Sequence, residues 1–396
     1  MTAPKRTART RTRRGNGEGT ITKRADGRFA AALWVDQPDG TRGRKWIYGR
    51  TRAEVAGKLT EVAQKVNSGS VMPTRSPTVA EFLDYWLREV VDPKLRPTTA
   101  SRYRSVVVQY LRPGLGKHRL EKLTVSAVQM FLNRQQENGR STQTLRMIRE
   151  VLSSALGRAM REELVGRNVA LLTTLPTPDR RRRTAWTAAQ ARQFLAVSVQ
   201  DALHTFFVLA VVYGMRRGEI AALCWEDVDF DRGKIIVRAS LVRVGGRLVR
   251  GRVKTAAGER MLPLVPTTRK ALQAQRKRQL EQRFAAGPEW EDSGYVFTTR
   301  TGRPIEPRNA SRSFDRIVAG TALPKIAFHD LRRTAATMLK SLGVPARDAM
   351  VILGHSHITV TLGIYSEVFD DELASAVGRI ETALGGVEIE GSTDAG

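Results

Sequence analysis

Two histidines, an arginine and a tyrosine near the carboxyl end are the residues whose types and spacing suggest chemistry. His329 precedes Arg332 by three positions, and His355 precedes Tyr365 by ten. Residues three apart on a helix lie on one face, so the first pair can reach a common point. A base, a cation, a hydrogen-bond donor and a weak oxygen nucleophile in one short segment favour attack on a phosphate. The nearby His357 receives no role.

Two predicted helices must position these groups. Apolar residues recur at helical spacing from Leu331 to Leu342, which predicts a helix that opens with His329. Gly354 is expected to end the next helix as a left-handed cap, immediately before His355. Tyr365 is expected in a short polar segment that follows.

The same residues resemble the carboxyl-terminal catalytic boxes of the tyrosine recombinases, the integrases of phages and mobile elements. His329 and Arg332 match the H-x-x-R box of that family. Leu353 to His355 match its L-G-H box, and Tyr365 matches its nucleophile, all in family order. The family also has an upstream box, G-[LM]-R-x-x-E, which residues 214–219 match with Arg216.

A phosphodiester is anionic and has a basic leaving group, so its cleavage requires cations, a nucleophile and a general base. Arg216 and Arg332 can each present a planar fork of donors to non-bridging oxygens and neutralise the charge that grows in the transition state. Tyr365 is protonated at neutral pH, because a free tyrosine has a pKa of about 10. His329 is the matching general base, since the pKa of a free histidine is about 6.5.

The resemblance implies the remaining roles. His355 would donate to a phosphate oxygen, and Lys254, on a hairpin, would protonate the leaving 5′ oxygen; Lys234 is the alternative lysine. The product would be a 3′-phosphotyrosine link, which a second 5′ hydroxyl reseals without ATP. No cofactor and no metal are implied, and no zinc-ligand spacing, Ser-His-Asp order or Walker loop is evident.

The composition indicates a polyanionic partner. The 396 residues predict about two or three domains. With 66 basic and 39 acidic residues the formal charge is +27, which favours nucleic acid as the partner, and the resemblance implies that this is double-stranded DNA. Cys224 is the one cysteine, which fits a reducing compartment, and no apolar run approaches a membrane span. We therefore expect a protein of the bacterial cytoplasm, associated with the nucleoid when bound, with no membrane partner.

The amino-terminal part predicts a small DNA-binding domain. Residues 1–17 are expected to form a disordered basic tail, and residues 18–67 three strands joined by Asp-Gly turns, then a helix capped by Thr51. This pattern resembles the arm-type DNA-binding domain of many integrases. The candidate DNA contacts are Arg28, Arg42, Arg44 and Lys45. The alternative is a basic, solvated sheet face.

Residues 78–175, after a linker at 68–77, predict an all-helical domain. It resembles the SAM-like core-binding domain of the family, which clamps the duplex opposite the catalytic domain. Candidate phosphate contacts near helix starts are Thr98, Arg104, Ser141 and Thr142; the alternative for each is an ordinary helix cap. Residues 176–183 are predicted to form a basic linker. Its candidate DNA contacts are Arg180, Arg181, Arg182 and Arg183, and the alternative is a solvated basic run without a role.

Residues 184–384 predict the catalytic domain, and 385–396 a disordered tail. We expect residues 252–255, with Lys254, to face residues 260–264 across a hairpin. An amphipathic helix over 370–384 is expected to dock on a neighbouring protomer, or else on its own domain. The predicted fold class is thus multidomain α+β: a sheet-plus-helix arm-binding domain, an all-α core-binding domain, and a mainly α catalytic domain with a small antiparallel sheet.

The predicted function is a site-specific recombinase that integrates or excises a phage or mobile element, as a homotetramer on its attachment sites with accessory DNA-bending or excision factors. A type IB topoisomerase would use the same chemistry to relax a single duplex. A DNA-binding regulator without activity is the third class, and the complete catalytic set argues against it.

Overall fold

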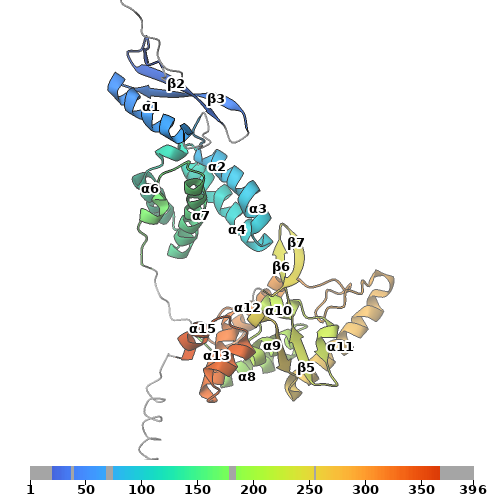
Figure 1. The fold of residues 1–396 in the computed structure, drawn as a ribbon. Coiled ribbons are helices and arrows are strands. Elements are labelled where there is room, and N and C mark those ends of the chain that lie inside the picture. Colours follow the sequence, from blue (N-terminus) through green and yellow to red (C-terminus); the bar gives the residue numbers. More distant parts are fainter. Residues whose placement is uncertain (1–19, 37–39, 68–74, 178–183, 254–255, 366–396) are drawn as a thin grey trace, which may run out of the picture. The chain divides into compact units, whose positions relative to one another are not determined.

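A computed structural model describes residues 20–36, 40–67, 75–177, 184–253 and 256–365, which form two compact units, residues 1–179 and 180–396 (Figure 1). Several predictions lie outside the described residues. These are the basic tail, Arg180 to Arg183, Lys254, the helix over 370–384 and the tail after it. No helix among the described residues is long and apolar enough to cross a membrane.

The amino-terminal sheet and helix are confirmed. Strands β1 (Thr22–Lys23), β2 (Phe29–Asp36) and β3 (Arg42–Gly49) pair antiparallel in that order, and α1 (Arg52–Asn67) contacts β2 and β3 (Figure 1). The backbone N–H of Glu54 donates to the Thr51 hydroxyl at 3.1 Å, so Thr51 caps α1 as predicted. Ala31, Ile47 and Val55 form the buried core between sheet and helix.

The rest of the first unit is all helical, as predicted. Its elements are α2 (Val79–Trp86), η1 (Leu87–Val91), α3 (Asp92–Lys94), α4 (Pro97–Val106), η2 (Val107–Leu111), α5 (Arg112–Leu115), η3 (Leu120–Lys122), α6 (Val125–Glu137), α7 (Thr142–Arg161) and η4 (Val169–Leu172). The π-helical turns η1 and η2 come just before Pro93 and Pro113, which lack the N–H that a regular helix needs. Trp86, Leu111 and Ile148 are buried in the shared core.

The second unit is mainly helical. Its helices and turns are α8 (Ala188–Val197), η5 (Ser198–Gln200), α9 (His204–Tyr213), α10 (Arg217–Ala221), η6 (Trp225–Asp227), η7 (Ala256–Gly258), α11 (Pro266–Ala286), η8 (Gly287–Glu289), α12 (Pro307–Ala319), α13 (Asp330–Ser341), α14 (Ala346–Leu353) and α15 (Ile358–Tyr365). Helix α9 is apolar on every side and is therefore buried. Phe206, Phe207, Phe314 and Phe328 pack edge-on or tilted in this core.

Two small antiparallel sheets complete the second unit, and they correct one prediction. Strand β5 (Lys234–Val237) lies between β4 (Val228–Asp229) and β8 (Arg260–Pro263), while β6 (Ala239–Val244) pairs with β7 (Arg247–Arg252). The predicted pairing of 252–255 with 260–264 is therefore wrong. Strand β8 buries Leu262 beside Ile235 of β5, whereas β7 is mostly exposed and returns along β6 through the Gly245–Gly246 turn.

The segment that carries Tyr365 also differs from its prediction. Tyr365 ends helix α15 rather than lying in a polar loop. Thr361 of this helix has no exposed surface. Its buried hydroxyl forms a hydrogen bond with a specific partner, which is described below. The segment differs from a polar one because Thr361 points into the domain and is buried.

Candidate active site

Gly214 brings the first arginine to the site. Helix α9 ends at Gly214 with φ +58°, in the left-handed region that glycine favours. A Cβ atom there would lie 2.6 Å from the Leu353 side chain, so only glycine fits. Arg216 then caps α10 and donates through Nη1 to Glu219 at 2.7 Å and through Nη2 to the Gly354 carbonyl at 3.0 Å. Its side chain stays 41% exposed, so it can still reach a ligand.

Arg332 is buried and has an unused donor. It lies in the first turn of α13 and is 6% exposed. Its Nη1 donates to the Gly214 carbonyl at 2.9 Å and its Nε to His355 Nε2 at 3.2 Å, but its Nη2 is buried without a partner. Burial, and then the charge of Arg216, lower the pKa of Arg332 to about 9. A buried cationic donor left unpaired is costly unless an anion joins it.

His355 follows Gly354, the left-handed cap of α14 at φ +65°, as predicted. Burial, and then the neighbouring Arg332, lower the pKa of His355 to about 4, so the imidazole is neutral at physiological pH. Its Nε2 accepts from Arg332, so Nδ1 carries the proton and donates to the Thr361 hydroxyl at 2.8 Å. In this state Nε2 cannot donate to a phosphate, which is the role the resemblance implied. A bound anion would favour protonation of His355 and so restore that role.

Tyr365 is half-buried and engaged. Its hydroxyl donates to the Val344 carbonyl at 3.1 Å, and burial raises its pKa above the ordinary value. The phenol is therefore protonated and does not point its proton at a base. Thr361 lies one helical turn before Tyr365 on α15, so the bond from His355 to Thr361 also fixes the helix that carries the phenol.

His329 and the two candidate lysines are the other predicted catalytic residues. His329 is exposed at the start of α13, three residues before Arg332. Lys254 lies outside the described residues. The alternative lysine, Lys234, is half-buried at the start of β5.

Glu219, Arg260 and Thr361 were not predicted as functional residues, but their side chains hold the site residues in place. Glu219 is 3% exposed and accepts from both Arg216 and Arg260. Burial would raise the pKa of Glu219, but Arg260 and Arg216 outweigh burial and hold it below the ordinary value. Thr361 is the third. Only Glu219 had a sequence signal, because it is the last residue of the G-[LM]-R-x-x-E box.

The candidate DNA contacts of the sheet do not share one face. Side chains alternate between the two faces along β3, so Arg42 and Arg44 lie on the exposed face. Lys45 lies on the other face with Ile47, toward α1. Lys45 therefore lies apart from Arg42 and Arg44, and DNA contact by the four candidates stays a prediction. Arg28 bonds to Asp26 within its turn, and Arg42 pairs with Asp36 at 3.0 Å on the exposed face.

Two of the four helical candidates, Ser141 and Arg104, already have local partners. Ser141 is the cap of α7, and its hydroxyl accepts from the Thr144 backbone at 3.3 Å. Thr142 is the first residue of that helix, and Thr98 is the second residue of α4. Arg104 pairs with Asp92 at 2.5 Å. These partners do not prevent phosphate contact, but they account for Ser141 and Arg104 without it.

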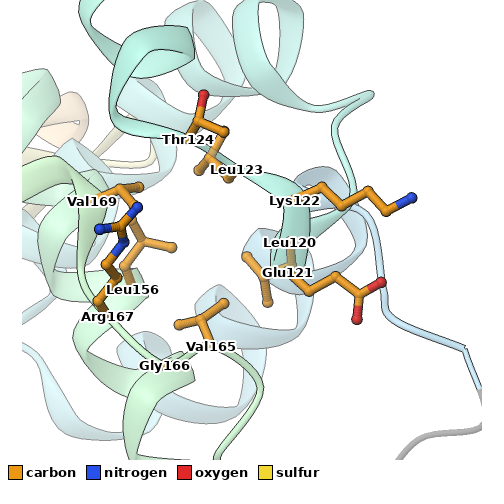
Figure 2. A pocket seen from close by; sticks show the side chains of 10 residues that line it. All are labelled: Leu120, Glu121, Lys122, Leu123, Thr124, Leu156, Val165, Gly166, Arg167 and Val169. Atoms are coloured by element: carbon orange, nitrogen blue, oxygen red, sulfur yellow. The ribbon is translucent and has the colours of Figure 1, made fainter. Parts of the chain in front are cut away.

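A hollow of about 480 Å³ in the first unit does not coincide with any of these residues. Figure 2 shows aliphatic side chains such as Leu123, Leu156 and Val165 around it, whereas Glu121 and Lys122 extend away from it. It contains none of the predicted catalytic side chains.

Two guanidinium groups, a neutral imidazole and a phenol on adjoining helices of one unit thus define the class of site. It can hold a phosphoryl group between cations, and a tyrosine lies on the next helix. The comparisons with known proteins agree with this class. Two family models match, "Phage integrase family" over residues 186–372 and "Phage integrase, N-terminal SAM-like domain" over residues 78–135.

Relatives match along most of their length. A tyrosine recombinase XerC-like protein of Caldanaerobacter subterraneus subsp. tengcongensis is 26% identical over 353 residues, or 84% of this chain and 90% of that protein. An integrase of Streptomyces ambofaciens is 29% identical over 368 residues, or 89% of this chain and 93% of the integrase. The chain therefore belongs to the tyrosine recombinase family.

Solved structures share the fold. The Tn1549 transposon integrase in complex with a circular intermediate DNA has a TM-score of 0.66 at 24% identity, over 77% of this chain and 100% of that one. A lambda integrase tetramer bound to a Holliday junction has a TM-score of 0.56 at 19% identity, over 90% of this chain and 99% of that one. The predicted fold class is confirmed.

The low pKa of His355 predicts a pH-dependent stability. An unfolded histidine binds a proton below about pH 6.5, whereas folded His355 does so only below about pH 4. The unfolded state therefore binds more protons between these values, so stability is complete above pH 6.5 and falls as the pH drops toward 4. Thermal unfolding measured across this range should show the decline.

The His355→Gln variant isolates this contribution. Its melting temperature should fall less steeply between pH 6.5 and pH 5 than that of the wild type. His204, whose pKa burial and then Arg278 also lower, remains in both proteins and gives the residual slope. Equal slopes in the two proteins would contradict a neutral, buried His355.

Proposed function

We propose that this chain cleaves and rejoins DNA strands at the attachment sites of a phage or other mobile element. The observation that carries the proposal is the buried Nη2 of Arg332, which has no partner and lies beside Arg216 and His355. A site that keeps a cationic donor dry and unpaired is prepared for an anion. The scissile phosphate of DNA is the anion that a tyrosine recombinase binds there.

In the proposed reaction the Tyr365 oxygen attacks the phosphorus and forms a 3′-phosphotyrosine bond, while the bond to the 5′ oxygen breaks. Arg216 and Arg332 hold the non-bridging oxygens throughout. His329 accepts the phenolic proton, and Lys254 gives a proton to the leaving 5′ oxygen. Attack requires Tyr365 to release the Val344 carbonyl, so DNA binding must move α15 or the side chain that it carries. A 5′ hydroxyl of the partner strand reverses the same steps.

Recombination in cells tests the proposal. The protein is expressed with a pool of DNA fragments from its native element and host, and the recombinant junctions are sequenced. We expect two families of junctions that share one core sequence. Relaxation of plasmids without junctions would instead support the topoisomerase alternative, and binding without either would support the regulator.

We further propose that the chain acts as a homotetramer on DNA, with accessory bending or excision factors, in the bacterial cytoplasm. The tetrameric lambda integrase on a Holliday junction supports the first part. Exchange between two duplexes needs four strand cleavages, and each protomer offers one Tyr365.

The outer face of the amino-terminal sheet is proposed as a second DNA-binding surface, of the arm type. Trp34 and Trp46 are 52% and 51% exposed, on the face opposite α1, and the Arg44 guanidinium lies 5.2 Å from the Trp34 ring centre. Large aromatic rings rarely stay exposed on a sheet without a partner. Arginine and flat apolar rings on a narrow sheet suit phosphates and thymine methyl groups in a major groove.

Arg44→Ala should therefore weaken binding to the arm-type sequences that flank the core site by about 10-fold or more, the usual cost of losing one base contact. Binding of the full chain is measured by competition between fragments with and without the flanking sequence. Lys58→Ala is the matched control, because Lys58 is exposed on α1, on the other side of the sheet. Equal losses in the two variants would contradict the assignment of the face.

A further inference from the structure

A second buried arginine, Arg260, lies behind the pair that faces the phosphate. It is the first residue of β8, and its side chain is 3% exposed. Its Nη2 donates to Glu219 at 2.9 Å, its Nε to the Ile352 carbonyl at 2.9 Å and its Nη1 to the Gly258 carbonyl at 3.1 Å. All three nitrogens bond to the protein in a buried position, so Arg260 does not itself contact a substrate.

Glu219 connects Arg260 to the catalytic arginine. One carboxylate oxygen accepts from Arg216 Nη1 at 2.7 Å, and the other accepts from the Arg216 backbone at 3.1 Å and from Arg260 Nη2. Two cations therefore share one buried anion. Without Arg260, the carboxylate would lose one of its two charged partners and could rotate about its side-chain bonds. The orientation of Arg216 depends on that carboxylate, because Arg216 sits at a helix cap with an exposed tip.

The Arg260 guanidinium also fixes the turn before His355. It holds the Ile352 carbonyl at the end of α14, and a Cβ atom on Gly354 would lie only 2.7 Å from Arg260 Nη1. The Gly354 carbonyl in turn accepts from Arg216 Nη2 at 3.0 Å. Hydrogen bonds therefore link Arg260 through Glu219 and Arg216 to the Gly354 carbonyl, and a direct bond links Arg260 to Ile352. His355 is the residue that follows Gly354.

We propose that Arg260 is a positioning residue of the active site: it orients Arg216 through Glu219 and the turn before His355 through Ile352. The proposal rests on the recombinase function proposed above. A guanidinium can bond Glu219 and the Ile352 carbonyl at once because it is a rigid fork, whereas a lysine offers a single nitrogen. Arg260→Lys therefore keeps the positive charge but can hold only one of these two partners.

The test measures single-turnover cleavage of a nicked suicide duplex that carries the core site read from the recombination junctions. Arg260→Lys should bind this DNA as the wild type does, and its cleavage rate constant should fall by about 10- to 100-fold, the range expected for misplaced catalytic groups. A misfolded fraction lowers the amplitude of the reaction and not its rate constant, so folding defects are separated. Arg250→Lys is the matched control, since Arg250 pairs with the buried Asp227 of the same unit and should leave the rate constant unchanged.

Two further readouts distinguish positioning from a merely structural role. In the Arg216→Lys background, adding Arg260→Lys should cost little more, because the two residues act through one group. On a duplex with a neutral methylphosphonate at the scissile position, less charge needs stabilisation, so the Arg260→Lys defect should shrink in parallel with that of Arg216→Lys.

The outcomes separate the two proposals. If the wild type forms no covalent product on the suicide duplex, the recombinase function fails, and this inference fails with it. If the wild type reacts but Arg260→Lys cleaves within about 2-fold of it, only the positioning role is overturned. A defect that is fully additive with Arg216→Lys and equal on both substrates also overturns the role.

Discussion

Tyr365→Phe should bind DNA as the wild type does but form no covalent complex on a nicked suicide substrate. The variant keeps the aromatic ring at the end of α15 and removes only the oxygen that is proposed to attack phosphorus. It also loses the hydrogen bond to the Val344 carbonyl, which costs about 1 kcal/mol of stability. The fold should therefore persist while cleavage disappears.

Denaturing gels detect the adduct, and a mobility-shift assay on the same samples measures binding. Tyr295→Phe is the control, because Tyr295 lies in the same unit but contacts the Cys224 backbone and Arg250 rather than the arginine pair. It should form adduct at the wild-type rate. An adduct that survives in Tyr365→Phe would refute the nucleophile.

Arg332→Lys should lower the cleavage rate constant by about 100- to 1,000-fold or more, the cost of removing a preorganised donor from a developing oxyanion. Lysine keeps the positive charge but cannot donate to the Gly214 carbonyl, to His355 and to a phosphate from one planar group. Binding should change little, because the chain carries 66 basic residues and the loss of one charge contact removes only a small part of the electrostatic attraction to DNA.

Single-turnover cleavage at saturating protein separates this loss from weaker binding. Arg303→Lys is a suitable control, since Arg303 is exposed and pairs with Glu291 on the same unit. A rate constant for Arg332→Lys within about 3-fold of the wild type would mean that the unpartnered nitrogen has no role at the phosphate.

Local signals explain what could be predicted from the sequence. Gly214 and Gly354 end their helices as expected, because a left-handed cap is a property of the glycine itself. Thr51 caps its helix, and the Asp-Gly turn at Gly27 joins its strands, for similarly local reasons. The catalytic boxes could be located in the sequence because each one is a short pattern of neighbouring residues.

What could not be predicted depends on contacts between distant segments. Strand β8 pairs with β5 rather than with the segment just before it, because Leu262 finds a buried partner in Ile235. Thr361 is buried only because His355 donates to it, and Arg260 has no sequence pattern that marks it as part of the site. The neutral state of His355 likewise follows from burial beside Arg332, which spacing alone does not reveal.

Mass spectrometry of the complex trapped on a suicide duplex tests the central claim most directly. After digestion with protease and nuclease, we expect one modified peptide, with a nucleotide attached through its 3′ phosphate to the oxygen of Tyr365. A nucleotide on any other residue, or one attached through a 5′ phosphate, would contradict the account.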